Sequence, residues 1–339
     1  MLSGIALITI LGKASLSPVR HPSFNSHFQG RFGCQSLNSN AIGKRTGGEY
    51  DPQEAGSTAR WMTPKVNAVR VTYCSFKSKA AKTEVSFHVY LPKAYDVNST
   101  RRFPVIYWLH GSGGGLPGIS PVSSFFDQAM EAKKMQPAII VFPNSMASGM
   151  WCDSKDGKTP IETIVIKELL PEVDAKFRTI SKRGGRIIEG FSMGGYGAGR
   201  LGFKYPELFA GVSMLAGGPL DLEFQGPRAA SNPAERARIL QSVYGGDLEV
   251  FKAQSPWMIA ATNRAKLTSG IAIRICIGEG DFTLSGNRAF SEHLKDLEIP
   301  HQFVTKPDVD HDTIKLLTTL GEDNWKFYRE NFAPEESLK

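Results

Sequence analysis

The chain has 339 residues, of which 41% are hydrophobic and 22% are charged, the balance of an ordinary globular protein. A chain of this length can bury a full hydrophobic core without metals or disulfides as staples. The formal net charge of +7 is uneven, because the residues before Glu49 include five of the 40 basic residues and none of the 33 acidic ones. The remaining chain is nearly neutral, which argues against a nucleic-acid partner, since such a partner requires a basic face.

Residues 1–62 are predicted to form a leader or a disordered segment, because they are rich in Ser, Asn, Gly and Arg and have no sustained periodicity. The apolar run at 5–11 is too short to span a bilayer. It resembles the apolar part of a signal peptide, although the charged segment that should precede it is missing. A signal peptide would make the protein secreted or periplasmic. An organellar transit peptide or an upstream start codon would instead leave it organellar or cytoplasmic.

Regular patterning from about Val66 predicts one domain over residues 63–334. Strand-like segments at 69–76 and 83–92 come first, followed by a polar loop at 93–102. Short apolar runs then alternate with amphipathic helices, including 159–177 and a final helix at 311–331. This alternation predicts an α/β fold of the α/β-hydrolase type, with a mostly parallel sheet and helices on both faces. The apolar runs are 103–111, 137–144, 184–192, 210–218, 270–281 and 301–307.

The segment "GFSMGG" contains the pattern Gly-x-Ser-x-Gly, with Ser192 between Gly190 and Gly194. It follows a predicted strand and precedes a predicted helix, as a nucleophile elbow requires. Glycines leave room around a serine on such a tight turn, and the helix N-terminus favours developing negative charge. The chain has 34 glycines, so a bare match is weak. The prediction that Ser192 is a nucleophile depends on this context.

A serine nucleophile needs a base, and in this fold the order along the chain is Ser, then Asp or Glu, then His. Three histidines follow Ser192. His293 lies inside a polar helix, and His301 precedes the last strand, at the wrong end of the sheet. His311 follows that strand and is therefore the predicted base.

The acid that orients His311 should follow the preceding parallel strand. That run ends in "GEGD", so Asp281 is the first choice and Glu279 the reserve. A carboxylate there would fix the tautomer of the imidazole and stabilise it once it is protonated.

An oxyanion hole needs two backbone N–H donors. We expect one from Met193, after the nucleophile, and one from Ser112 in the loop "HGSGGG". His110 and Gly111 open this loop and are placed at the substrate, His110 as a brace for the loop.

Trp151 and Asp153 follow another predicted parallel strand and should lie near the same edge of the sheet. Trp151 could stack on an aryl or sugar ring of a substrate. Equally, it could pack under its loop while Asp153 caps a turn. The sequence leaves both alternatives open.

The segments "FPVIYWLHGSGGG", "GRIIEGFSMGGYGA", "ICIGEGDF" and "PDVDHD" resemble the "putative esterase" family of α/β-hydrolases over about residues 66–332. This family includes esterase D, S-formylglutathione hydrolases, feruloyl and acetylxylan esterases, and mycolyltransferases. The resemblance implies a triad of Ser192, Asp281 and His311, with Ser112 and Met193 as oxyanion donors. "WLHGS" replaces the Tyr-Leu-Ser-Gly type of segment of S-formylglutathione hydrolases, which favours a carbohydrate-linked ester.

The sequence thus predicts a serine carboxylesterase that acts through an acyl-enzyme on feruloyl, acetyl or short-chain esters. Three alternatives stay open: an acyltransferase on the same triad, an S-formylglutathione hydrolase-like thioesterase, and an inactive glycan-binding domain. No metal or organic cofactor is implied, and the predicted partner is a small-molecule or carbohydrate ester. The four cysteines form no CxxC pair, and their pairing cannot be assigned from the sequence.

Overall fold

The computed structural model describes residues 61–97, 100–225, 232–333 and 336–337, which belong to one compact unit. The predicted leader therefore lies outside the described residues except for Trp61 and Met62. Trp61 is buried, and its carbonyl accepts hydrogen bonds from Ser86 Oγ at 3.3 Å and Asn144 Nδ2 at 3.2 Å. The packed part of the chain thus includes a residue that the sequence placed in the leader.

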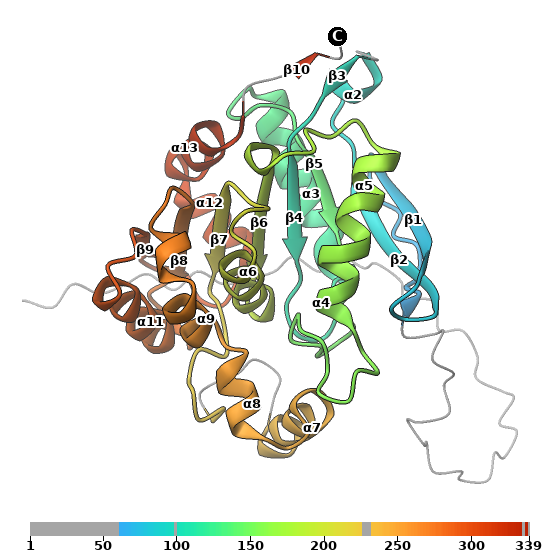
Figure 1. Cartoon of the computed structure of the whole chain (residues 1–339). Coiled ribbons are helices and arrows are strands. Elements are labelled where there is room, and N and C mark those ends of the chain that lie inside the picture. Colours follow the sequence, from blue (N-terminus) through green and yellow to red (C-terminus); the bar gives the residue numbers. More distant parts are fainter. Residues whose placement is uncertain (1–60, 98–99, 226–231, 334–335, 338–339) are drawn as a thin grey trace, which may run out of the picture. The chain divides into compact units, whose positions relative to one another are not determined.

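Eight strands form one sheet in the order β1-β2-β5-β4-β6-β7-β8-β9 (Figure 1). The pairs β1–β2 and β2–β5 are antiparallel, and every other neighbouring pair is parallel. This topology confirms the predicted α/β-hydrolase type of fold. The strands are β1 (Val71–Ser78), β2 (Thr83–Tyr90), β4 (Val105–Leu109), β5 (Ile139–Phe142), β6 (Arg186–Phe191), β7 (Gly211–Leu215), β8 (Ala272–Gly278) and β9 (Gln302–Lys306).

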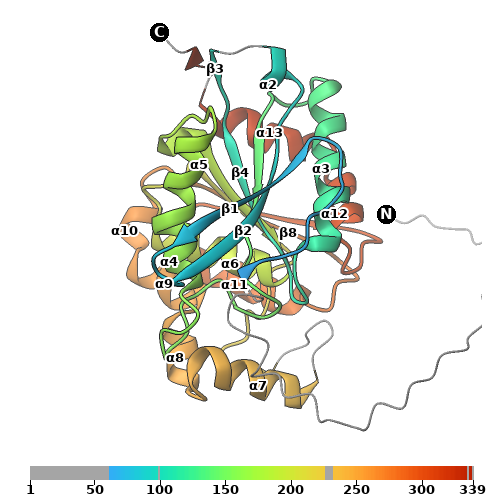
Figure 2. The same ribbon diagram turned by 90° about the vertical axis from the view of Figure 1, so that its right-hand side faces the viewer.

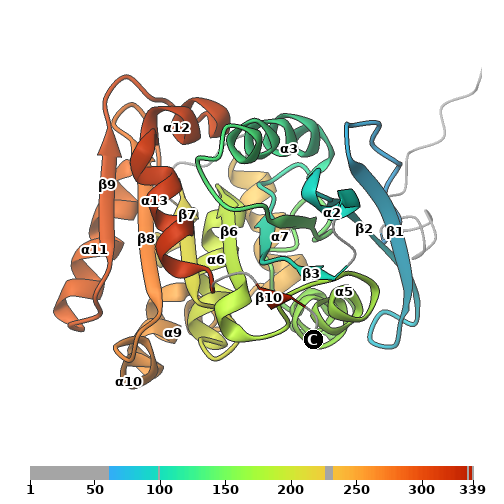
Figure 3. The same ribbon diagram turned by 90° about the horizontal axis from the view of Figure 1, so that it is seen from above.

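Helices cover both faces of the sheet, as Figures 2 and 3 show for α3 and α12 on one side and α5 and α6 on the other. The strands β4 to β7 are buried along their whole length because their side chains pack alternately into two hydrophobic cores. One core includes side chains of α3 (Leu116–Glu131), α12 (Thr313–Leu320) and α13 (Glu322–Asn331). The other includes α5 (Leu170–Lys176), α6 (Met193–Lys204), α9 (Pro256–Thr262) and α11 (Leu284–Asp296).

Three elements predicted from the sequence differ in detail from those in the structure. The polar loop at 93–102 contains the short helix α2 (Ala94–Val97) and the strand β3 (Arg101–Arg102), which pairs with β10 (Glu336–Ser337). The helix predicted at 159–177 divides into α4 (Ile161–Thr163), the π-helix η1 (Ile164–Leu169) and α5. Pro171 in this stretch cannot donate an i→i−4 hydrogen bond, which favours such a local change of helix type.

The final helix predicted at 311–331 is two helices, α12 and α13. They are separated by Gly321, whose φ of 60° and ψ of −130° are not helical and suit glycine. His311 lies before α12, and Asp312 caps that helix by accepting a hydrogen bond from Lys315 N at 2.8 Å.

An insertion between β7 and β8 contains α7 (Pro233–Tyr244), α8 (Leu248–Ala253), α9 and α10 (Arg264–Leu267). In Figure 1, α7 and α8 lie beyond the carboxyl end of β4.

Near the start of β6 the chain forms the short 3₁₀ helix η2 (Arg183–Gly185). None of the helices in the described ranges combines the length and the apolar character that crossing a membrane requires. Cys74, Cys152 and Cys276 are free thiols, and Cys34 lies outside the described residues.

Candidate active site

Ser192 occupies the turn between β6 and α6 with a φ of 59° and a ψ of −121°. A positive φ is uncommon and strained for a residue with a side chain. A Cβ on Gly194 would lie 1.9 Å from the carbonyl oxygen of Leu109, and one on Gly190 would lie 2.4 Å from the carbonyl oxygen of Gly194. Both glycines are therefore required by space, which explains why the serine lies between them.

The end of β7 and the segment that follows it hold the backbone of Ser192 in this conformation. Ser192 N donates to the carbonyl of Leu215 at 2.9 Å, and Gly218 N donates to the carbonyl of Ser192 at 3.1 Å. These bonds fix the nucleophile candidate to the end of the neighbouring strand.

His311 and Asp281 meet at the same edge of the sheet. His311 Nδ1 donates to Asp281 Oδ2 at 2.7 Å, and the carboxylate is buried. Its other oxygen, Oδ1, accepts from the N–H and the hydroxyl of Thr283, both at 2.8 Å. With Nδ1 donating, Nε2 is the acceptor nitrogen of the neutral ring. That atom is buried and has no hydrogen-bond partner in the described part of the chain.

The other candidates for acid and base point elsewhere. Glu279 accepts a hydrogen bond from Thr305 Oγ1 at 3.0 Å. His293 Nε2 lies 3.1 Å from the carbonyl of Trp257. His301 Nε2 lies 2.8 Å from the hydroxyl of Ser291. Asp281 and His311 are the two candidates that are hydrogen-bonded to each other, and their catalytic roles stay predictions.

A cavity of about 450 Å³ lies over these residues, and Ser192, His311, Gly111 and Ser112 line it. Apolar side chains form part of its wall, namely Trp108, Val122, Phe191 and Ile314. The rings of Phe191 and Phe282 also contact the imidazole of His311, with centroids 4.6 and 4.4 Å away. The serine and the histidine thus face one space that could hold a small molecule.

His110 braces the glycine-rich loop, as predicted. Its Nε2 accepts a hydrogen bond from Ser145 N at 3.2 Å, so Nδ1 is protonated and donates to the carbonyl of Gly111 at 2.8 Å. Burial lowers the pKa of His110 to about 4 because a low-dielectric surrounding disfavours the charged ring. His110 is therefore neutral near pH 7. Gly111 lies against the nucleophile candidate, since a Cβ on it would be 3.2 Å from Ser192 Cβ.

Of the two expected oxyanion donors, only Ser112 is shown at this cavity. Met193 is the first residue of α6, so its N–H has no acceptor within the helix. Ser112 lines the cavity directly. Their roles as oxyanion donors stay predictions.

The expectation that Trp151 stacks on a substrate ring is wrong for this structure, because the side chain is fully buried. Its Nε1 donates to the carbonyl of His110 at 3.2 Å, and its ring packs against that imidazole with centroids 4.9 Å apart. Helix α6 accommodates the indole at Gly197, where a Cβ would lie 2.4 Å from it. Trp151 thus supports the glycine-rich loop by packing against His110.

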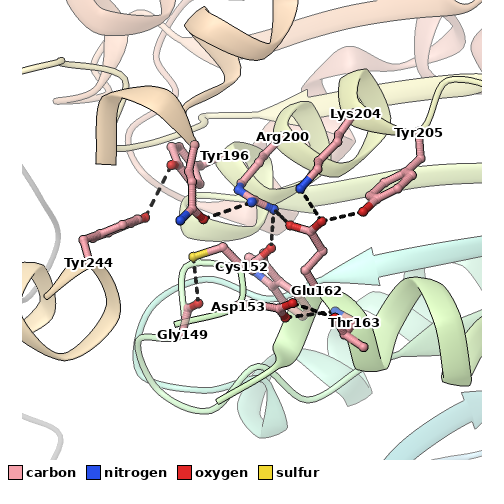
Figure 4. A network of polar contacts seen from close by, with 12 residues as sticks. Gly149, Cys152, Asp153, Glu162, Thr163, Tyr196, Arg200, Lys204, Tyr205 and Tyr244 are labelled. Atoms are coloured by element: carbon pink, nitrogen blue, oxygen red, sulfur yellow. Dashed lines mark hydrogen bonds and ion pairs between the residues drawn. The ribbon is translucent and has the colours of Figure 1, made fainter. Parts of the chain in front are cut away.

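Asp153 is likewise not a substrate contact but a cap, which was the alternative left open. Its Oδ1 accepts from Thr163 N at 3.0 Å and its Oδ2 from Thr163 Oγ1 at 2.6 Å (Figure 4). Beside it, Figure 4 shows Glu162 bound by Arg200 and Lys204. Arg200 also donates to the carbonyl of Trp151 at 3.1 Å. This network holds the loop in place and does not line the cavity at Ser192.

Thr283 makes two hydrogen bonds to Asp281 and was not predicted from the sequence. A signal was present, because an Asp whose side chain bonds the backbone two residues later is a frequent turn motif. The spacing Asp-x-Thr could have indicated this contact.

Together the parallel sheet, the strained elbow and the carboxylate–histidine pair at its edge define an α/β-hydrolase of the esterase type. Comparison with known proteins agrees. The model of the family described as "Putative esterase" matches residues 78–336, and the chain belongs to this family.

Three similar proteins illustrate the relationship. An esterase of Mycobacterium tuberculosis is 35% identical over 154 residues, which cover 44% of this chain and 33% of the relative. The chain thus matches about a third of that protein's length. An acetyl esterase of Caldicellulosiruptor saccharolyticus is 26% identical, with 65% of this chain and 84% of the relative covered. A solved ferulic acid esterase has a TM-score of 0.64 at 24% identity, covering 77% of this chain and 98% of its own. At that identity the likeness concerns the fold.

Proposed function

We propose that the protein is a serine carboxylesterase in which Ser192 is the nucleophile, His311 the base and Asp281 the group that orients the histidine. One observation carries this proposal. His311 Nδ1 is engaged by Asp281 at 2.7 Å, while its Nε2 has no partner among the described residues and the ring lines the same cavity as Ser192. An acceptor nitrogen held beside a strained serine is the arrangement that activates a hydroxyl.

The reaction follows from these positions. His311 Nε2 accepts the hydroxyl proton while Ser192 Oγ attacks the ester carbonyl carbon. The N–H groups of Met193 and Ser112 stabilise the oxyanion. The histidine then gives the proton to the departing alcohol, which leaves an acyl-enzyme. Water, deprotonated by the same nitrogen, attacks the acyl group and regenerates the serine.

For the substrate we propose a carbohydrate-linked feruloyl or acetyl ester, or a short-chain ester. The apolar wall at Trp108, Val122 and Phe191 suits an aryl or short acyl group. A second cavity of about 910 Å³ shares Gly114, Gly115 and Pro117 with the first. Its lining includes the polar side chains of Asn144, Ser148, Asp156, Lys158 and Arg238, which can hydrogen-bond to a sugar. The acetyl esterase relative supports this substrate class.

Replacing Ser192 by alanine tests the catalytic assignment. We expect Ser192→Ala to lower kcat for p-nitrophenyl acetate on the order of 10⁴-fold or more, because the nucleophile is lost. The matched control is Ser269→Ala, which removes an exposed hydroxyl after α10 and should leave kcat unchanged. Normal hydrolysis by Ser192→Ala would refute the assignment.

A substrate panel tests the specificity. Feruloyl and acetyl sugars, short-chain aryl esters and S-formylglutathione should be compared by kcat/KM, with product analysis in the presence of a competing alcohol. We expect free acid as the main product and a preference for the oxygen esters. A preference for S-formylglutathione, or transfer of the acyl group to the alcohol as the main reaction, would contradict the proposed substrate class or reaction.

A further inference from the structure

The hydroxyl of Thr283 has one hydrogen and two acceptors within reach. Asp281 Oδ1 lies 2.8 Å from Thr283 Oγ1, and the carbonyl of Ala216 lies 3.5 Å away. The shorter bond to the charged oxygen is the stronger one, so the hydrogen points to Asp281. With the Thr283 N–H on the same oxygen, the carboxylate is held with Oδ2 toward His311.

Asn287, one turn into α11, is fully buried behind this threonine. Its Nδ2 donates to the carbonyls of Gly217 at 2.8 Å and Thr283 at 2.9 Å, and it lies 3.3 Å from Thr283 Oγ1. The two carbonyls fix the orientation of the amide, because the reversed amide would place its oxygen against both. In this orientation Oδ1 is buried without a hydrogen-bond partner in the described ranges. An unpartnered buried acceptor is destabilising, so this asparagine is not the best residue for stability alone.

Gly217 belongs to the segment that anchors the nucleophile. In this segment the carbonyl of Leu215, two residues before Gly217, accepts the N–H of Ser192. The N–H of Gly218, one residue after Gly217, donates to the carbonyl of Ser192. The side-chain amide of Asn287 therefore joins the loop that carries Asp281 to the segment that holds Ser192.

We propose that Thr283 and Asn287 are positioning residues for ester hydrolysis: Thr283 orients the carboxylate of Asp281, and Asn287 fixes the distance between the acid loop and the serine. The inference rests on the proposed function, because it takes Asp281, His311 and Ser192 as the reacting set. Neither residue lines the cavity at Ser192, so both act through the residues that they hold.

Thr283→Val tests the first half, since valine keeps the shape and the backbone N–H but loses the hydroxyl. We expect kcat to fall about tenfold, the size of one lost hydrogen bond to a charged group, with KM changed by less than about twofold. Thr283→Ser restores the hydroxyl and should recover most of the loss. The downfield NMR signal of the His311 Nδ1 proton should shift in Thr283→Val and return in Thr283→Ser. An unchanged kcat in Thr283→Val, or no recovery in Thr283→Ser, would overturn this role.

Asn287→Leu tests the second half, with Asn324→Leu as the matched control. Asn324 is also fully buried in a helix but contacts Arg274 in the middle of the sheet. We expect both variants to unfold at a lower temperature, and only Asn287→Leu to lose about tenfold or more in kcat per folded molecule. Equal kcat in the two variants would overturn the role of Asn287. If Asn287→Leu does not fold, Asn287→Ser, a smaller change that also removes the amide, takes its place with Asn324→Ser as its control and the same criterion.

The same experiments separate this inference from the proposed function. If the unaltered protein hydrolyses esters and loses that activity in Ser192→Ala, an unaffected Thr283→Val refutes only the positioning role. If Ser192→Ala is as active as the unaltered protein, the proposed function itself fails.

Discussion

The sheet has one buried pair of an acid and a base in its middle and a second pair at the edge where Ser192 lies. In the middle of the sheet Glu189 Oε1 binds Arg274 Nη2 at 3.0 Å, with both side chains almost fully buried. Beyond the ends of β8 and β9, Asp281 binds His311, which lines the same cavity as Ser192. Both pairs draw on β8, because Arg274 lies within this strand and Asp281 follows its last residue, Gly278.

The two pairs differ in whether a polar atom is left free. Glu189 also accepts from Ser213 Oγ at 3.0 Å and from Tyr328 OH at 2.6 Å, so both of its oxygens are bound. Burial alone would lower the pKa of Arg274, but Tyr328 and Glu189 outweigh it and raise that pKa, so the guanidinium stays charged. In the pair at the edge, His311 Nε2 has no partner among the described residues. A buried ion pair alone is therefore no sign of a catalytic site, whereas an unsatisfied nitrogen at the cavity is what the proposed mechanism requires.

Asp281→Asn should have the largest effect and would break the pair at the edge. An amide in place of the carboxylate favours the wrong tautomer of His311, so we expect kcat to fall on the order of 10⁴-fold. The unfolding free energy should change far less than kcat. Ester hydrolysis assays with urea unfolding on the same variant check this, and a kcat near that of the unaltered protein would refute the assignment of Asp281.

Glu189→Leu would break the mid-sheet pair and should have the opposite effect, a large loss of unfolding free energy with little change in kcat. Arg274 would remain as an uncompensated buried charge, which lowers the unfolding free energy by about 3–5 kcal/mol. Activity per folded molecule should change little. The double variant Glu189→Leu with Arg274→Met should recover most of the stability. A loss of kcat at unchanged stability in urea unfolding would mean that the mid-sheet pair belongs to the site.

Glu162 is a further buried carboxylate of which both oxygens are bound, Oε1 by Lys204 and Tyr205 and Oε2 by Arg200. Burial alone would raise its pKa, but Arg200, Lys204 and Tyr205 outweigh burial and lower it from 4.5 to about 2. The depressed pKa means that this group stabilises the fold above about pH 4.5 and loses that contribution as the pH falls toward 2. We expect the free energy of unfolding to fall by about 3 kcal/mol as the pH is lowered across this window.

Unfolding free energies from urea titrations between pH 2.5 and 6 test this window, with Glu162→Gln as the control. The control should show a shallower acid slope because it lacks the titrating group. Identical slopes in the two proteins would exclude Glu162 as a source of acid sensitivity.

Trp151→Phe should give the smallest effect. The variant loses the hydrogen bond from Nε1 to the carbonyl of His110, so the unfolding free energy should fall by about 1 kcal/mol. KM for aryl and sugar esters should stay within about twofold, because the buried indole does not contact substrate. A large rise of KM for ring-bearing substrates only would restore the stacking role.

The order of residues along the chain was enough to predict which candidate side chains meet at the edge of the sheet. A parallel sheet brings the carboxyl ends of its strands to one edge. Ser192, Asp281 and His311 each follow such a strand, so their meeting could be predicted. The glycines around Ser192 could also be predicted, because the elbow leaves no room for a Cβ.

Side-chain direction within loops could not be predicted in the same way. Trp151 follows a parallel strand as expected, but only the packed structure shows that the space beside Gly197 takes the indole inward. The contacts of Asn287 escaped prediction because they join segments about 70 residues apart in sequence, with no periodic pattern between them. The break at Gly321 was missed because both halves of the final helical region have apolar positions at helical spacing.

Covalent labelling can show whether Ser192 is the nucleophile. A fluorophosphonate reagent should react once with the folded protein, and peptide mass mapping should place the adduct on Ser192. Asp281→Asn and His311→Ala should react far more slowly, whereas Glu189→Leu in its folded form should react at the rate of the unaltered protein. A folded protein that stays unmodified, or an adduct on another residue, would contradict the account.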